Sequence, residues 1–335
     1  MTTRTTKTAN RGTGNSKTNK AIKTCEAPRA DVYERVTAKI IEQLEAGTRP
    51  WHRPWAINTA PLTRPLRANG LAYRGINTLL LWMQAQTCGY RSSFWMTYRQ
   101  ALGLGAQVRK GEKAATVVYA GAIERTEQNE KGEDEESRIP FLKAYSVFNA
   151  DQVDGLPERF HPVAVEPNTP LDQMQRIEAA DAFFTNIGAD LRHGGDRAFY
   201  QPAADFIQMP LYETFESAEA YAATLAHEAV HWTAHTSRLD RDIKNSFGTK
   251  DYAREELVAE LGAVFLGADL GVFIEPRADH ANYLASWLAV LKEDKRAIFR
   301  AAAHAERAAT FLHRLQPDYV EPATEADPER SGQAA

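Results

Sequence analysis

Two histidines four residues apart, with a glutamate directly after the first, form the pattern in this chain with the clearest chemical meaning: His227, Glu228 and His231. Residues spaced by four lie on one face of a helix, so both imidazoles can bind a single Zn²⁺ ion through ring nitrogens. Glu228 would then be close enough to act as general base toward a water molecule beside the metal. The spacing therefore predicts a metal-assisted hydrolytic site in which Glu228 is the catalytic residue.

A catalytic zinc site usually has three protein ligands, so a third is expected elsewhere in the chain. His235 is excluded because it would lie about 12 Å from His227 along a straight helix. We expect Glu256 as the third ligand and Glu260, on the same helical face, as the acceptor that fixes a histidine tautomer. Glu255 is the alternative ligand, and a solvated acidic face is the alternative for Glu256 and Glu260. One Zn²⁺ per chain is the expected cofactor, with another divalent transition metal as the alternative.

The elements that must position these residues can be expected from apolar periodicity. Residues Ser217–Thr236 predict the helix that carries the histidines, and a second helix begins at Glu255 and continues through Phe265. Small residues on the second helix, such as Ala263, would let the two helices approach closely. Before them, Asp205–Pro210 predicts a strand closed by proline, and an edge strand there could pair with a peptide substrate.

The charge distribution divides the chain in two. The 335 residues carry a net charge of −4, but residues 1–125 hold 20 Lys and Arg against 7 Asp and Glu, and the remainder holds 20 against 37. A basic first half indicates a polyanionic partner, and the acidic second half indicates a different task. The absence of a hydrophobic leader and of a long apolar run predicts a cytoplasmic protein without a membrane partner.

Composition and proline-rich stretches predict the domain organisation. We expect a disordered basic tail over 1–29, a nucleic-acid-binding domain over 30–157, a linker over 158–170, a second domain over 171–315 and a disordered acidic tail over 316–335. The first domain should contain helices over Asp31–Ala46, Asn77–Thr87 and Thr97–Leu102, strands over Lys113–Arg125 and Phe141–Phe148, and a solvated loop over Gln128–Ser137. A long helical stretch is expected from Tyr283 to Leu315.

Cationic and aromatic residues alternate densely between residues 49 and 119. Single-stranded nucleic acid is held by cations along its phosphates and by aromatic rings on which bases stack. No base-reading motif is present, so binding without sequence preference is expected. The alternative for the aromatic residues is burial in the core. The candidate contacts are Arg49, Trp51, Arg53, Trp55, Arg74, Arg91, Trp95, Tyr98, Arg99, Arg109 and Lys110.

The metal motif and its surroundings resemble a known family. The arrangement is similar to gluzincin metallopeptidases, and the strings HEAVHWTAHTSRLDR (227–241) and YAREELVAELGAVFL (252–266) resemble the C-terminal domain of ArdC-type antirestriction proteins of conjugative plasmids. That family typically has glycine where this chain has Ala234. Three further segments, Tyr73–Asn77, Phe94–Tyr98 and Val108–Glu112, resemble the single-stranded-DNA-binding domain that ArdC shares with TraC-type primases.

These observations predict an α+β protein of two domains. The N-terminal domain is expected to be α+β and to bind single-stranded DNA, and the C-terminal domain to be a mostly helical gluzincin-like metallopeptidase with a small sheet. The resemblance implies protection of incoming plasmid DNA from restriction during conjugation, and a host protein is a candidate peptidase substrate. The alternative is a single-stranded-DNA-binding or primase-accessory protein whose metal site is structural and not proteolytic.

Overall fold

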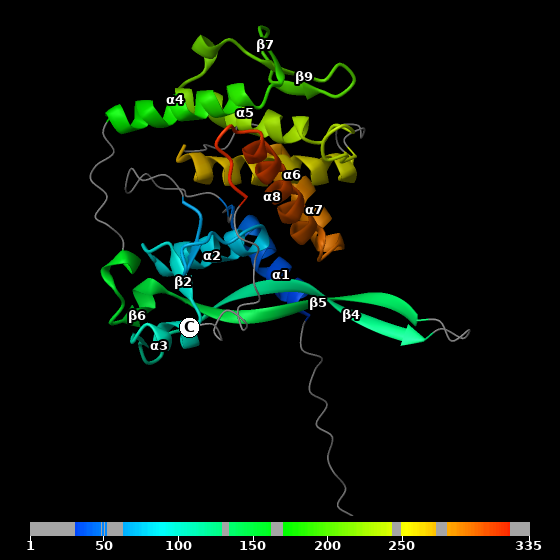
Figure 1. Cartoon of the computed structure of the whole chain (residues 1–335). Helices are drawn as coiled ribbons and strands as arrows, with labels where there is room; N and C mark the ends of the chain where they lie inside the picture. The colour runs from blue at the N-terminus through cyan, green and yellow to red at the C-terminus, as the bar shows by residue number, and fades with distance from the viewer. Residues whose placement is uncertain are drawn as a thin grey trace, which may run out of the picture. The chain divides into compact units, whose positions relative to one another are not determined.

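The fold can be followed through most of the chain beyond its first thirty residues. The computed structural model describes residues 31–47, 49, 51, 63–128, 134–161, 170–242, 249–272 and 280–321. Residues Val32–Ala335 belong to one compact unit. Helices and sheets are both present in it, as Figure 1 shows, and this confirms the predicted α+β class.

The described part of residues 31–161 combines helices with a sheet whose strand order is β1-β2-β5-β4. The helices are α1 (Val32–Glu45), α2 (Ile76–Cys88) and α3 (Tyr98–Gly103), and they agree with the three predicted helices to within one residue at each end. The strands are β1 (Leu66–Arg67), β2 (Phe94–Met96), β4 (Ala115–Gln128) and β5 (Asp134–Asn149), while β3 (Gln107–Val108) and β6 (Val153–Asp154) pair separately.

The hairpin of β4 and β5 is longer than the sequence indicates. Its antiparallel register runs from Ala115 opposite Val147 to Gln128 opposite Asp134. The expected loop over Gln128–Ser137 is therefore wrong at Gln128 and over residues 134–137, which are strand, while residues 129–133 lie outside the described residues. Its acidic composition indicated a loop, but a strand ladder is built from backbone hydrogen bonds, which do not depend on side-chain polarity.

The described part of residues 170–321 places a small sheet beside a group of helices. The sheet has the order β7-β9-β8, with β7 (Asp190–His193), β8 (Phe199–Gln201) and β9 (Phe206–Met209). The helices are α4 (Pro170–Asn186), α5 (Ala218–Trp232), α6 (Lys250–Leu270), α7 (His280–Glu293) and α8 (Ala297–Arg314). The predicted helical stretch Tyr283–Leu315 is thus two helices. The strand that we expected at the edge of the sheet, β9, is its central strand, and β8 is an edge strand.

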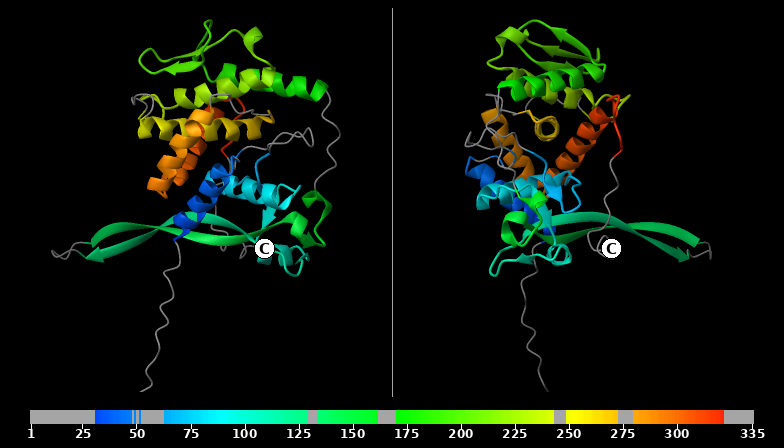
Figure 2. Two further views of the ribbon diagram at one scale, coloured as in Figure 1. Left: turned by 180° about the vertical axis from the view of Figure 1, so that it is seen from behind. Right: turned by 60° about the vertical axis from the view of Figure 1, so that its left-hand side comes forward.

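Helix α6 is the centre of the packing. It contacts α5 on one side and α7 and α8 on another, and the two views of Figure 2 agree on this order. A Cβ atom at Gly262 would come within 2.7 Å of the Val230 side chain, so glycine allows α5 to approach α6 closely. This approach brings the residues on the facing sides of the two helices together, including the predicted metal ligands.

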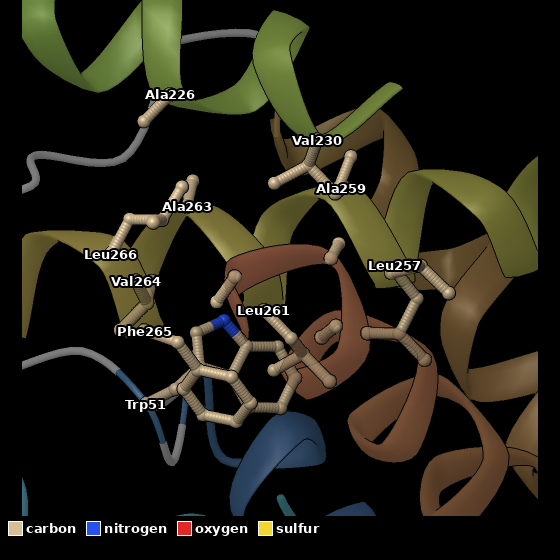
Figure 3. Close-up of a cluster of buried hydrophobic side chains, with 14 of the residues drawn as sticks. Trp51, Ala226, Val230, Leu257, Ala259, Leu261, Ala263, Val264, Phe265 and Leu266 are labelled. Carbon is tan, nitrogen blue, oxygen red and sulfur yellow. The ribbon is translucent and has the colours of Figure 1, made fainter. Parts of the chain in front are cut away.

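The hydrophobic core does not follow the predicted domain boundary. Val36 and Ile40 of α1 belong to the same buried cluster as the residues of α5 to α8. In Figure 3, Val230 lies against α6 from one side, and Trp51 lies on the other side near Phe265. Among the described residues, no helix has both the length and the apolar character needed to cross a membrane.

Candidate metal centre

Three of the predicted residues come together between α5 and α6. His227 and His231 lie one turn apart on α5, and Glu256 faces them from α6. The Nε2 atoms of the two histidines are 3.2 Å apart, and the Glu256 carboxylate oxygens lie 3.5 Å from Nε2 of His227 and 3.4 Å from Nε2 of His231. Ligand atoms about 2.0–2.1 Å from a tetrahedral ion are separated by about 3.3 Å. The triangle therefore has the size that a zinc-like ion requires.

The remaining nitrogens of the two histidines have different surroundings. His231 Nδ1 lies 3.3 Å from a carboxylate oxygen of Glu255. His227 Nδ1 is buried, and no hydrogen-bond partner is found for it among the described residues. Glu260, which we expected to fix a histidine tautomer, accepts a hydrogen bond from the Trp51 indole at 3.4 Å, so for His231 the assignment of Glu260 is wrong. Glu255, which we expected only as an alternative ligand, lies beside Nδ1 of His231 instead. It can do so because it lies on the part of α6 that faces the end of α5.

The electrostatics of this cluster suit a bound cation. Burial raises the pKa of the Glu256 carboxyl, but hydrogen bonds from His227 and His231 outweigh burial and hold that pKa far below its ordinary value. Burial lowers the pKa of His231, whereas hydrogen bonds to Glu255 and Glu256 and the charges of both carboxylates raise it to about 10. The raised pKa favours the protonated form of His231 in the metal-free protein, and a metal ion bound through Nε2 must displace that proton.

This proton predicts how metal affinity depends on pH. The ion must displace a proton from His231, whose metal-free pKa is about 10, so one proton is released on binding. We expect the dissociation constant for Zn²⁺ to fall about tenfold per pH unit between about pH 7 and 9 and to level off near the pKa. Competition with a chromophoric chelator across this range measures the slope. A dissociation constant that does not change with pH, after correction for the chelator, would contradict the arrangement.

Glu228 lies beside this triangle at the wall of a cavity of about 580 Å³. Its side chain is almost fully buried. Tyr252 also lines the cavity, and its hydroxyl lies 3.1 Å from that of Tyr283. Burial and the hydrogen bond with Tyr283 raise the pKa of the Tyr252 phenol, so it remains a hydrogen-bond donor at neutral pH.

The end of helix α5 determines the surroundings of two residues near the motif, Trp232 and His235. Helix α5 ends at Trp232, earlier than the predicted Thr236, so His235 lies in the following turn, where its Nδ1 is 2.8 Å from the Ser237 hydroxyl. Trp232 is buried beneath the guanidinium of Arg238, whose central carbon is 3.9 Å from the ring centroid. Neither side chain belongs to the metal-binding group.

The predicted nucleic-acid contacts are divided by burial. Trp51 and Trp95 are each only 1% exposed and pack in the hydrophobic core, so their assignment as stacking platforms is wrong. Arg49 lies 3.7 Å from Glu260, and Arg74 lies 3.9 Å from Glu306. Arg53 and Trp55 lie outside the described residues.

The other predicted contacts reach the surface around α3 and β3. A hydrogen bond from the Gln107 amide to the Tyr98 hydroxyl, 3.1 Å long, joins these two elements. Arg109 is anchored there by ion pairs with Glu112 and Asp154. The exposed members are Tyr98, Arg99, Arg109 and Lys110, with Arg91 exposed before β2.

Sequence reasoning missed two residues that shape the centre, Arg241 and Tyr252. Arg241 donates hydrogen bonds to Glu255 across the gap between α5 and α6. A signal for it was available, because an arginine between a metal-binding helix and an acidic helix indicates a buried ion pair. Tyr252 has no comparable signal, since a tyrosine in the first turn of a helix is most often a packing residue.

Two family models match this chain, each over a different range of residues. A family model for the N-terminal domain of the anti-restriction factor ArdC matches residues 30–148, and one for a zincin-like metallopeptidase matches residues 178–304. The "uncharacterized protein y4eC" of Sinorhizobium fredii is 42% identical over 86% of this chain and 93% of its own length. DNA primase TraC of Escherichia coli is 38% identical over 87% of this chain, but the chain spans only 28% of that primase.

Two solved structures of an antirestriction protein are also similar to this chain. The metal-free crystal structure of the antirestriction protein ArdC from plasmid R388 superimposes with a TM-score of 0.71 at 49% sequence identity, covering 85% of this chain and 97% of that chain. The Mn(II)-bound structure of ArdC has the same TM-score and identity and covers 87% of this chain and all of that one. A zincin-like domain implies a divalent metal, and the residues gathered between α5 and α6 fit one.

Proposed function

Because the chain belongs to the ArdC family of antirestriction proteins, we propose that it protects incoming plasmid DNA from host restriction during conjugation. In this proposal the first part of the chain binds single-stranded DNA without sequence preference. The second part holds one divalent metal ion in a site of the peptidase type, and a host protein is the candidate substrate. The cytoplasm of the recipient cell is where such a protein would act.

The observation that carries the metal half of the proposal is the triangle of donor atoms on His227, His231 and Glu256. We propose these three residues as the ligands and Zn²⁺ as the resident ion, because two imidazoles and a carboxylate are a donor set of catalytic zinc sites. Mn²⁺ is the competing ion, since ArdC from plasmid R388 has a Mn(II)-bound structure. A divalent ion bound there would lower the pKa of water and polarise a peptide carbonyl.

The surrounding residues can supply the other parts of a hydrolytic site. Glu228 would accept the proton of the attacking water and later return it to the leaving amine. Strand β8 pairs with β9 on one side, and its residues Phe199 and Tyr200 line the cavity beside the triangle. A peptide could therefore extend the sheet along β8, with main-chain hydrogen bonds holding the scissile bond near Glu228.

The peptidase half is tested by digestion of an unfolded protein such as reduced casein. The zinc-loaded chain should cleave it, a chelator should stop the cleavage because it removes the ion, and added Zn²⁺ or Mn²⁺ should restore it. Comparing the two ions at equal occupancy identifies the one that the site uses. If the metal-loaded chain leaves every peptide bond intact, the site is not a peptidase and its metal has a structural role.

The DNA half is supported by the exposed basic surface around α3 and β3, which we call the α3–β3 surface: Tyr98, Arg99, Arg109 and Lys110. Arg99 and Lys110 extend into solvent, where phosphates can reach them. Tyr98 is 46% exposed, so one of its edges or faces is available to a base. Similarity to the primase TraC supports a nucleic-acid partner for this part of the chain.

A double substitution tests this surface. Replacing Arg99 and Lys110 by alanine should weaken binding of a labelled single-stranded oligonucleotide, and the slope of log affinity against log salt should become shallower by about 0.7 for each phosphate that is no longer neutralised. The control replaces Lys250 and Arg314 by alanine, which gives the same change in charge. Both residues are exposed, lie in the second half of the chain and are paired there with acidic side chains. Fluorescence anisotropy at several salt concentrations measures both. Equal effects of the two double variants would contradict a specific DNA surface.

A further inference from the structure

The turn that follows α5 carries two buried arginines that the metal-binding motif does not explain, Arg238 and Arg241. Both belong to the string HEAVHWTAHTSRLDR, and their side chains are 10% and 5% exposed. A buried guanidinium needs partners for all its donors, because an unpaired buried charge is costly. The partners of these two residues lie in different directions.

Arg241 joins the end of α5 to the start of α6. Its Nε donates to Oε2 of Glu255 at 3.1 Å and its Nη2 donates to Oε1 at 2.8 Å, which is a bidentate pair. The same Nη2 donates to the Val230 carbonyl at 2.7 Å, and Nη1 donates to the Thr233 hydroxyl at 2.8 Å. Each nitrogen of the guanidinium therefore has an acceptor, and the group has a single well-defined position.

The acceptor of this bidentate pair, Glu255, also contacts His231, one of the proposed metal ligands. Oε1 of Glu255, which accepts from Arg241, also lies 3.3 Å from Nδ1 of His231. A carboxylate that holds the Nδ1 proton of an imidazole leaves the Nε2 lone pair directed at the metal. Without Arg241, the Glu255 carboxylate would be free to rotate away from His231, and its buried charge would lose its strongest partner.

We propose that Arg241 is a positioning residue for the metal site: it fixes the Glu255 carboxylate so that Glu255 orients the His231 ring for metal binding. This inference rests on the metal site of the proposed function. It adds to that site a residue that touches neither the ion nor the substrate, and whose effect passes through two successive hydrogen-bonded contacts.

Arg238 is the matched control within the same turn. It donates to the Asp205 carboxylate through Nη1 at 3.0 Å and through Nη2, and to the Tyr200 hydroxyl at 3.2 Å. Its Nε donates to the Trp232 carbonyl at 2.6 Å. Arg238 thus has as many partners as Arg241, although its main acceptor, Asp205, is 38% exposed, and these partners lead to the small sheet and not to Glu255.

The test compares Arg241→Met, Arg241→Lys and Arg238→Met with the unaltered chain. Zn²⁺ dissociation constants are measured by chelator competition at one pH, and urea unfolding reports the stability of each metal-free variant. We expect Arg241→Met to raise the dissociation constant about 10–100-fold and Arg241→Lys to raise it less, as is usual when the acceptor behind a metal-binding histidine is disturbed. Arg238→Met should stay within about threefold of the unaltered chain despite a comparable decrease in stability.

A dissociation constant for Arg241→Met within threefold of the unaltered chain would overturn the inference, and so would an equal rise in Arg238→Met. If Arg241→Met does not fold, Arg241→Lys carries the comparison, and a value equal to that of the unaltered chain then overturns the inference. A second readout uses the metal-free protein. The ring proton on His231 Nδ1 should give a slowly exchanging NMR signal in the unaltered chain and in Arg238→Met, and this signal should disappear in Arg241→Met.

The NMR readout separates the inference from the proposed function. If the chain binds no divalent ion, or if Glu256→Gln leaves the Zn²⁺ dissociation constant unchanged, the proposed ligand set fails. The His231 ring signal still shows whether Arg241 positions that ring. A signal that persists in Arg241→Met would contradict the positioning role whatever the metal affinity is.

Discussion

Replacing Glu228 by glutamine should lower metal-dependent peptide hydrolysis about 10²–10⁴-fold, which is the contribution typical of a general base. Glutamine has the size and shape of glutamate but cannot accept a proton at neutral pH. Glu228 is only 3% exposed and lies at the wall of the cavity beside the metal triangle, so bulk water cannot easily replace its function. The rate of cleavage of a fluorogenic peptide by the zinc-loaded chain measures the effect on kcat/KM.

The controls for this prediction are the two kinds of binding that should not change. The glutamine variant should bind Zn²⁺ and single-stranded DNA as the unaltered chain does. Glu216→Gln, an exposed acid just before α5, should keep full activity with the same change in charge. A Glu228→Gln chain with undiminished cleavage would contradict the catalytic assignment. If that variant loses cleavage but protects plasmid DNA in a restriction assay as well as the unaltered chain, protection depends on DNA binding and not on hydrolysis.

Replacing Arg64 by methionine should lower the free energy of unfolding by about 3–5 kcal/mol, because it removes the buried cation at the centre of an ion-pair network. Arg64 donates two hydrogen bonds to Asp269 at 2.9 Å each and one to Glu306 at 2.9 Å. Its guanidinium also lies over the ring of Phe265, 4.4 Å from the centroid. These interactions join a residue before β1 to α6 and α8, so their removal should loosen the attachment of the first part of the chain.

Arg74 provides the matched control, because it approaches the same Glu306 from a more exposed position. The two side chains are 3.9 Å apart and Arg74 is 33% exposed. Arg74→Met should therefore change the free energy of unfolding by less than about 1 kcal/mol. Urea unfolding of the metal-free variants gives both values. Similar values for the Arg64 and Arg74 variants would contradict a special role for the buried network.

Features set by local spacing could be predicted from the sequence. The helix periodicity of α1, α2 and α3 is visible along the chain, and so is the relation of His227 to His231, because residues four apart share a helical face whatever the rest of the fold. Glu256 could be predicted to face the histidines because it shares a helical face with small residues that let the second helix approach the first closely. The fold class followed from the same alternation of helical and strand-like segments.

Features set by contacts between distant segments could not be predicted in this way. Trp51 and Trp95 have the composition of stacking platforms, but the tertiary fold buries both. Glu255 and not Glu260 lies beside Nδ1 of His231, and only the position of α5 against α6 decides between these two carboxylates. The ion network of Arg64 spans more than 200 residues of sequence, so no local pattern indicates its partners.

The position of a bound ion tests the central claim most directly. A crystal of the chain soaked with Zn²⁺, with anomalous diffraction recorded on both sides of the zinc absorption edge, locates the ion independently of any assay. We predict one ion per chain, about 2.0–2.2 Å from Nε2 of His227, Nε2 of His231 and a carboxylate oxygen of Glu256, with one coordination position open toward Glu228. An ion coordinated by Glu255 or Glu260 in place of Glu256, or the absence of an ion between α5 and α6, would contradict this account.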